Sequence, residues 1–178
     1  MARLPFWLFS WYIALKAMKN FQSFSSRETA ELGERLAKQL ANQFAAGIGH
    51  GATVVALQGD LGAGKTTFTQ GFARGLGIKR RMASPTFIIM RRFPVGKRRD
   101  FYHLDAYRIK TTDSLEVFGA DEIFKDPKNI VLVEWPEKIK KILPKKTLWL
   151  KFRYGKKENE RIISGSGIIG LGVKVTKK

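Results

Sequence analysis

The stretch Gly59–Thr66, which reads Gly-Asp-Leu-Gly-Ala-Gly-Lys-Thr, has the residue types and the spacing of a phosphate-binding loop, G-x-x-x-x-G-K-[ST]. Glycines let the backbone fold tightly around a phosphate, with successive N–H groups pointing inward as donors. Lys65 supplies a compact cation that reaches the β- and γ-phosphates, and the hydroxyl of Thr66 is a ligand for Mg²⁺. The loop therefore predicts that the chain binds a nucleotide.

The sequence around this loop has the order that such a site requires. Residues 53–58 form an apolar, β-branched run typical of a buried parallel strand, and residues 67–76 carry apolar side chains at helical spacing. The positive end of that helix adds to an anion site. The residues expected to contact the nucleotide are those of the loop and the residue after it: Asp60, Leu61, Gly62, Ala63, Gly64, Lys65, Thr66 and Thr67.

Two acids stand at the ends of predicted strands, Asp105 after 101–104 and Glu134 after 130–133. The carboxyl ends of strands in an α/β sheet lie on the edge where ligands bind, and a P-loop nucleotidase needs an acid to hold Mg²⁺ or its water. We therefore expect Lys65, Glu134 and Asp105 to be catalytic. Thr66, Glu134 and Asp105 are the expected metal ligands. The alternative for each acid is a strand-end carboxylate satisfied by a turn.

Several classes of protein are excluded or left open by composition and motifs. The chain has no cysteine and two histidines, so thiolate and histidine-cluster metal sites are excluded. The guanine-reading N-K-x-D motif and the L-S-G-G-Q motif of transporter ATPases are both absent. A small-molecule or nucleotide kinase stays open as an alternative, because Arg80, Arg81, Arg91 and Arg92 suit a phosphate-clamping lid.

The charge is strongly basic, with 33 Lys and Arg against 15 Asp and Glu and a formal net charge of +18. Two blocks contain basic residues and no acid: 79–99 and 138–157. Such blocks are candidates for contact with RNA or with an acidic protein surface. The alternative is a solvated lysine-rich surface, and no aromatic RNA-binding pattern or zinc spacing accompanies either block.

The first seventeen residues differ from the rest. Residues 4–15 are almost wholly apolar and aromatic, but they are too few to span a bilayer, which needs about 20. No small-x-small cleavage site follows them. We interpret 1–17 as an extension, either a start codon assigned too far upstream or a tail that touches a membrane or partner. Residues 18–178 are the expected P-loop domain, cytoplasmic and without stable membrane insertion.

The other elements fit one α/β domain. Ser25 and Glu28 have the spacing of a capping box before a long amphipathic helix. A strand at 84–90, a turn at 94–96 and the strand at 101–105 predict a β-hairpin. A helix is expected within 114–124, and further strands are expected at 147–154 and 167–175.

Together the motifs resemble one family, the bacterial TsaE (YjeE) ATPases. The resemblance lies in residues 59–68 (Gly-Asp-Leu-Gly-Ala-Gly-Lys-Thr-Thr-Phe), 84–87 (Ser-Pro-Thr-Phe), 103–108 (His-Leu-Asp-Ala-Tyr-Arg) and 134–137 (Glu-Trp-Pro-Glu), and it extends roughly from Phe21 to Arg153. Four motifs in the right order are far more specific than the P-loop alone.

The resemblance implies a single P-loop NTPase-like α/β domain, with a mixed, mostly parallel sheet flanked by helices. It also implies a slow ATPase that uses ATP and Mg²⁺ and serves the threonylcarbamoyladenosine modification of tRNA by acting on a complex of TsaD and TsaB. Trp135 would lie beside the nucleotide or the partner, with core packing as the alternative. Residues 84–87 would form a switch segment near the γ-phosphate.

Overall fold

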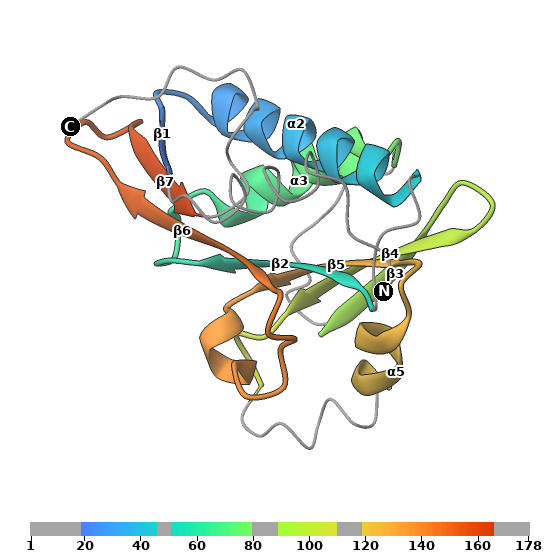
Figure 1. Ribbon diagram of the computed structural model, residues 1–178. Coiled ribbons are helices and arrows are strands. Elements are labelled where there is room, and N and C mark those ends of the chain that lie inside the picture. The colour runs from blue at the N-terminus through green and yellow to red at the C-terminus, as the bar shows by residue number, and fades with distance from the viewer. Residues whose placement is uncertain (1–18, 46–50, 80–88, 110–118, 166–178) are drawn as a thin grey trace, which may run out of the picture.

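The computed structural model describes residues 19–45, 51–79, 89–109 and 119–165. Its centre is one seven-stranded sheet with helices on both faces (Figure 1). The strands are β1 (Lys19–Ser23), β2 (Thr53–Gln58), β3 (Met90–Val95), β4 (Arg99–Asp105), β5 (Asn129–Glu134), β6 (Leu148–Tyr154) and β7 (Arg161–Gly165). The helices are α2 (Ser26–Ala45), α3 (Lys65–Gly75), α5 (Ala120–Lys125) and the 3₁₀ helix η1 (Pro136–Ile139).

The sheet is mixed, in the order β1-β7-β6-β2-β5-β4-β3. The three parallel pairings are the central ones, of β2 with β5, β2 with β6 and β4 with β5. The three antiparallel pairings add β1, β7 and β3 at the sides. The α/β class predicted from sequence is confirmed, and the parallel centre brings the carboxyl ends of β2, β4 and β5 to one edge.

Side chains alternate between two cores on opposite faces of the sheet. On β2, Val55 and Leu57 join the core under α2 and α3, whereas Val54 joins the core beside α5 and η1. Figure 1 shows these two layers above and below the sheet. Because central parallel strands are buried on both faces, β5 is buried at every position.

The helices α2 and α3 cross with their backbones in contact. A Cβ at Gly71 would lie 1.8 Å from the backbone oxygen of Ala30, and one at Gly33 would lie 2.3 Å from that of Phe68. Glycine inside a helix costs about 1 kcal/mol relative to alanine. Here the absent side chains permit a close approach that holds α3, and with it the phosphate-binding loop, against α2.

The capping box at the start of α2 forms in a shifted version. The Glu28 amide donates to Ser25 Oγ at 3.1 Å, as the motif predicts. The Glu28 carboxylate, however, accepts from the amide of Phe24 at 2.8 Å. Both bonds satisfy backbone donors near the helix end, which has no intrahelical partners for them.

The hairpin of β3 and β4 is confirmed, but its turn lies later than predicted. β3 continues through Pro94 and Val95, and the chain turns at 96–98. Pro94 is tolerated because β3 is an edge strand and needs no N–H toward a further neighbour. α3 begins at Lys65, two residues before the predicted start.

Several predicted segments lie wholly or partly outside the described residues. They are the extension 1–17, the strand at 167–175, most of the strand at 84–90 including the switch segment 84–87, and the first half of the helix at 114–124. The sequence pattern did not predict β1 and β7, which are short and carry few apolar residues. In the described part of the chain, no helix has the length and apolar character needed to cross a membrane.

Candidate nucleotide-binding site

The phosphate-binding loop connects β2, at the centre of the sheet, to the start of α3. Gly62 and Gly64 have φ values of 75° and 100°, which L side chains rarely adopt. The Ala63 amide donates to the Asp60 carbonyl at 3.2 Å and closes the loop on itself. Leu61, at the outer tip, is 78% exposed. The loop therefore has the tight conformation that the sequence predicts.

Lys65 lies under this loop, with 5% of its surface exposed. Its Nζ donates to the carbonyls of Gly59 at 2.6 Å and Asp60 at 2.7 Å. The same atom lies 3.9 Å from the centre of the Trp135 ring, which is a cation–π distance. The ammonium group is thus bonded by the loop's own carbonyls and an aromatic face.

The surroundings of Lys65 have opposing effects on its pKa. Burial lowers the pKa of Lys65 from its usual value, because the charged ammonium loses water. The nearby carboxylates of Glu134, Glu137 and Asp105 oppose this effect. A polyanion at this position would favour the charged ammonium in the same way as these carboxylates.

Glu134 is the polar centre of the site, and only 2% of it is exposed. Its Oε2 accepts a hydrogen bond from Thr66 Oγ1 at 3.1 Å, and its Oε1 accepts one from Thr69 Oγ1 at 2.9 Å. His103 Nε2 lies 3.0 Å from the same Oε1. Three side chains from two other elements therefore orient one carboxylate against the start of α3.

These contacts also determine the protonation of Glu134. Burial by itself raises the pKa of Glu134, but the hydrogen bond and charge of His103 and the hydroxyls of Thr69 and Thr66 outweigh it. The net pKa of Glu134 is lowered below its usual range. Glu134 is therefore ionised at neutral pH and is suited to attract a cation or orient a water.

Asp105 lies beside Glu134 at the sheet edge, since the two residues pair in the register of β4 and β5. Asp105 Oδ1 accepts the backbone N–H of Tyr107 at 3.0 Å. Burial raises the pKa of Asp105 above its usual value; the Tyr107 hydrogen bond lowers it, and the charge of Glu134 raises it again. The structure thus brings the two predicted acids together, with pKa values shifted in opposite directions.

Trp135 has an unusual backbone. Its φ of 58° is the one positive value among the non-glycine residues that the structure describes. This left-handed conformation turns the chain from β5 into η1, and the ring lies against Tyr107, with centroids 5.0 Å apart. Strained residues of this kind often occur at ligand sites. The ring lies at the site, over Lys65, and it also packs against the core beside α5.

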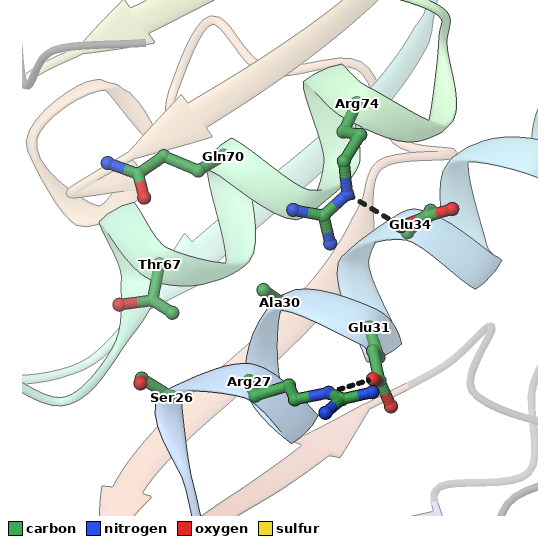
Figure 2. A pocket seen from close by; sticks show the side chains of 8 residues that line it. All are labelled: Ser26, Arg27, Ala30, Glu31, Glu34, Thr67, Gln70 and Arg74. Carbon is green, nitrogen blue, oxygen red and sulfur yellow. Dashed lines mark hydrogen bonds and ion pairs between the residues drawn. The ribbon is translucent and has the colours of Figure 1, made fainter. Parts of the chain in front are cut away.

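The side chain of Thr67, another predicted site residue, faces α2. It lines a shallow cavity of about 550 Å³ between α2 and α3, which Figure 2 shows from close by. The other residues around this cavity are Ser26, Arg27, Ala30, Glu31, Glu34, Gln70 and Arg74. Its arginines pair with its glutamates, Arg27 with Glu31 at 2.9 Å and Arg74 with Glu34 at 2.7 Å (Figure 2). The cavity therefore has no surplus positive charge for an anion.

His103 and Thr69 also contact Glu134, although the sequence motifs did not predict a role for either residue. His103 is fully buried, and its Nδ1 has no hydrogen-bond partner within the described residues. A signal for His103 was present: strand side chains alternate, so a residue two before Asp105 shares its face. Thr69 is one helical turn after Thr66 and so faces the same carboxylate.

The oxygen ligands near the carboxyl ends of β4 and β5 suit a hard cation. Thr66 and Glu134 place a hydroxyl and a carboxylate 3.1 Å apart, with Asp105 on the adjacent strand, and Mg²⁺ prefers such oxygen ligands. Among the described residues, no group of three histidine, aspartate or glutamate side chains is placed to hold a metal ion alone. A Mg²⁺ ion at this site would take its remaining ligands from phosphate and water.

A glycine-rich loop between a central parallel strand and a helix, facing an acid at the end of the neighbouring strand, defines a P-loop NTPase-like α/β protein. Residues 23–163 match the family model described as threonylcarbamoyl adenosine biosynthesis protein TsaE, and the chain belongs to this family. The resemblance seen in the sequence motifs is therefore confirmed.

Individual proteins of this family are also similar to the chain. A protein of Bacillus subtilis (strain 168), named tRNA threonylcarbamoyladenosine biosynthesis protein TsaE, is 44% identical over 115 residues, 64% of this chain and 70% of that protein. A Treponema pallidum protein of the same name is 33% identical and covers 74% of this chain and 88% of its own length. The crystal structure of Bacillus subtilis YdiB superposes with a TM-score of 0.64 at 29% identity, over 86% of this chain and 87% of that one.

Proposed function

We propose that this chain is a slow, Mg²⁺-dependent ATPase that supports the threonylcarbamoyladenosine modification of tRNA by acting on a complex of TsaD and TsaB. The observation that carries the ATPase part is the contact between Thr66 Oγ1 and Glu134 Oε2. It joins the predicted metal ligand of the loop to the predicted catalytic acid. The TsaE family, whose curated members are named for this modification of tRNA, supports the biological role.

Each residue of the site would have its own role in ATP hydrolysis. Backbone N–H groups of the loop and Lys65 would hold the phosphates, and Thr66 with Asp105 and Glu134 would hold Mg²⁺ and its water. When bound, Mg²⁺ neutralises charge on the phosphate oxygens. Glu134, ionised and held by three side chains, would orient the attacking water.

Lys65 must exchange partners in this proposal. Its Nζ now binds the carbonyls of Gly59 and Asp60 and lies over Trp135. A phosphate offers stronger, charge-assisted hydrogen bonds than two neutral carbonyls. We therefore expect the ammonium to turn toward the phosphates when a nucleotide binds, which leaves the Trp135 ring beside the ligand.

A small-molecule or nucleotide kinase is the alternative that the sequence left open. Of the arginines proposed for a lid, Arg80 and Arg81 lie outside the described residues. Arg92 forms an ion pair with Asp100 at 2.7 Å, within the β3–β4 hairpin. No described feature favours the kinase, and the ATPase is the function that we propose.

The proposed partners are TsaD and TsaB, with tRNA contact through the basic blocks and activity in the cytoplasm. Residues 138–157 support a polyanionic partner, because their nine basic side chains are all exposed: Lys138, Lys140, Lys141, Lys145, Lys146, Lys151, Arg153, Lys156 and Lys157. Exposed charges are screened over about 8 Å at physiological ionic strength. Contact through this block should therefore weaken as salt is raised.

Turnover with defined partners tests the proposal. ATP hydrolysis should be slow for the protein alone and should change on addition of TsaD and TsaB, while small phosphate acceptors have no effect. Affinity for the TsaD–TsaB pair should be higher with an ATP analogue than with ADP or no nucleotide. Equal affinity in all three states contradicts the partner model, and stimulation by a small acceptor with a phosphorylated product supports the kinase.

Glu134→Gln tests the assignment of the acid. This substitution should slow hydrolysis by about 100-fold or more while ATP binding weakens much less, because the carboxylate acts mainly on the water and the metal. Single-turnover hydrolysis and equilibrium ATP binding measure the two effects separately. Hydrolysis at the wild-type rate in Glu134→Gln would exclude the proposed role.

A further inference from the structure

The hairpin of β6 and β7 contacts the outer side of the phosphate-binding loop. Tyr154 Oη donates a hydrogen bond to the carbonyl of Leu61 at 2.6 Å. Arg161 Nη2 makes a longer contact of 3.4 Å with the carbonyl of Gly62. The guanidinium of Arg161 also lies 4.6 Å from the centre of the Tyr154 ring. Two side chains from the C-terminal hairpin therefore bind successive carbonyls of the loop.

The β6–β7 hairpin packs closely against the phosphate-binding loop at two glycines. A Cβ at Gly62 would lie 2.7 Å from Tyr154 Oη, and a Cβ at Gly59 would lie 2.4 Å from the backbone oxygen of Phe152. β6 thus packs directly along the loop. The glycines of the motif are needed here for contact with the hairpin as well as for their backbone angles.

The hairpin turn holds Arg161 in place. Arg161 Nη1 donates to the carbonyls of Glu158 at 2.6 Å and Glu160 at 2.9 Å. The Glu160 carboxylate in turn accepts the backbone N–H groups of Lys156 at 2.8 Å and Lys157 at 3.0 Å. Because the turn is hydrogen-bonded within itself, the guanidinium reaches the loop from a defined position.

The direction of these carbonyls matters for phosphate binding. A phosphate is bound by backbone N–H groups that point into the loop, and a peptide that rotates would present its carbonyl in place of its N–H. Glycine-rich backbone loses more conformational freedom on ordering than any other. Hydrogen bonds that hold the carbonyls of Leu61 and Gly62 toward the hairpin reduce that cost at the moment of binding.

We infer that Tyr154 and Arg161 are positioning residues that hold the loop in its phosphate-binding conformation, so that nucleotide affinity depends on the β6–β7 hairpin. This inference rests on the proposed nucleotide binding. Neither residue touches the phosphates; each acts through a carbonyl of the loop. Their substitution should affect binding and leave the chemical step, which depends on Glu134, largely unchanged.

The experiment compares Tyr154→Phe, which removes one hydroxyl, and Arg161→Met with the wild-type protein. Lys128→Met is the control, because Lys128 is an exposed cation that precedes β5, outside the hairpin and outside both basic blocks. Calorimetric titration gives the Kd for ADP and for pyrophosphate, turnover gives KM and kcat, and thermal unfolding reports the fold.

For Tyr154→Phe we expect the Kd for ADP and the KM for ATP to rise about threefold to tenfold, with kcat within about twofold of wild type. Arg161→Met should change in the same direction, and Lys128→Met should bind as wild type does. The loss should be equal for ADP and pyrophosphate, because the loop contacts phosphate.

Three outcomes overturn the inference. One is an unchanged Kd in both variants while the wild-type protein binds ADP. The second is a loss confined to ADP, which would place these side chains against the adenosine. The third is a fall in kcat as large as the rise in KM, which would place these residues in the chemical step. A wild-type protein that binds neither ADP nor pyrophosphate would instead refute the proposed function itself.

Discussion

His103 Nε2 lies 3.0 Å from Glu134 Oε1, and both side chains are buried at the edge where β4 and β5 end. The two residues face each other because β4 and β5 are parallel neighbours, with His103 paired to Leu132 and Asp105 to Glu134. The His103 ring helps to hold the Glu134 carboxylate, which also accepts hydrogen bonds from Thr66 and Thr69. A histidine outside the P-loop thus orients the acid beside it.

Two substitutions of His103 distinguish its hydrogen bond to Glu134 from the volume of its side chain. Gln places its amide nitrogen near the position of Nε2 and keeps the bond to Glu134, whereas Asn places its nitrogen near the position of Nδ1 and loses that bond. We expect His103→Gln to retain most of the hydrolysis rate and His103→Asn to lose about tenfold or more, since residues that orient catalytic groups commonly contribute that much. ATP affinity should change less than threefold. Equal rates in the two variants would contradict the positioning role.

Lys65→Ala should abolish hydrolysis and weaken ATP binding by about tenfold to 100-fold, because charge-assisted hydrogen bonds to phosphate have no replacement. Burial lowers the pKa of Lys65, so its charge does not stabilise the fold. We therefore expect the protein to remain folded, with little change in its unfolding midpoint at pH 7. Lys151→Ala, at an exposed lysine on β6, is the control for charge. Wild-type turnover in Lys65→Ala would exclude the loop as the nucleotide site.

The two acids should have opposite effects on the pH dependence of stability. The folded-state pKa of Glu134 is lowered from 4.5, so its carboxylate stabilises the fold above about pH 4.5, and this contribution is lost as pH falls through the folded pKa. Glu134→Gln should cost about 1–3 kcal/mol at pH 7, and the difference from wild type should shrink in acid.

The pKa of Asp105 is shifted in the opposite direction, so its charge has the opposite effect on stability. Its folded-state pKa is raised from 3.8, so the ionised carboxylate destabilises the fold at neutral pH, and the penalty disappears in acid. Asp105→Asn should be as stable as wild type or more stable at pH 7. Urea unfolding of wild type and both variants between pH 3 and pH 7 measures these differences. Parallel pH profiles for all three proteins would contradict the assigned shifts.

Nucleotide binding should change the fluorescence of Trp135. The ammonium of Lys65 lies 3.9 Å from the ring centre, and we expect it to turn toward the phosphates when ATP binds. Titration with ATP should alter the emission of the wild-type protein and of Trp149→Phe, and should have no effect on the emission of Trp135→Phe. A response that persists in Trp135→Phe would assign the signal to another tryptophan and contradict this reading.

The crossing of α2 and α3 gives a prediction about stability. Gly71→Ala places a Cβ 1.8 Å from the backbone oxygen of Ala30, so the helices must move apart, at a cost of about 3 kcal/mol. Gly96→Ala is the control, since its Cβ would enter open space and only its φ of 63° is strained, at about 1 kcal/mol. Chemical denaturation measures both. Equal losses would mean that the close approach does not limit the packing.

The sequence by itself determined the features that depend on neighbouring residues. The loop from Gly59 to Thr66, the strand before it and the helix after it follow from local backbone preferences, as does the hairpin of β3 and β4. Asp105 and Glu134 were predicted at one sheet edge because each ends an apolar strand, and the parallel pairing of β4 and β5 places them there. The strands β1 and β7 were missed, because short strands with few apolar residues have no periodic signal.

The tertiary structure decided the contacts between residues far apart in the chain. Glu134 meets Thr69 across 65 residues, and Tyr154 meets Leu61 across 93. Such pairs depend on strand order, β6 and β5 on either side of β2, and on the register between strands. Strand order results from how all the apolar faces are buried together, so no local pattern encodes it. For that reason the chemistry of the loop was readable from the sequence, whereas the side chains that hold it in position appeared only in the folded chain.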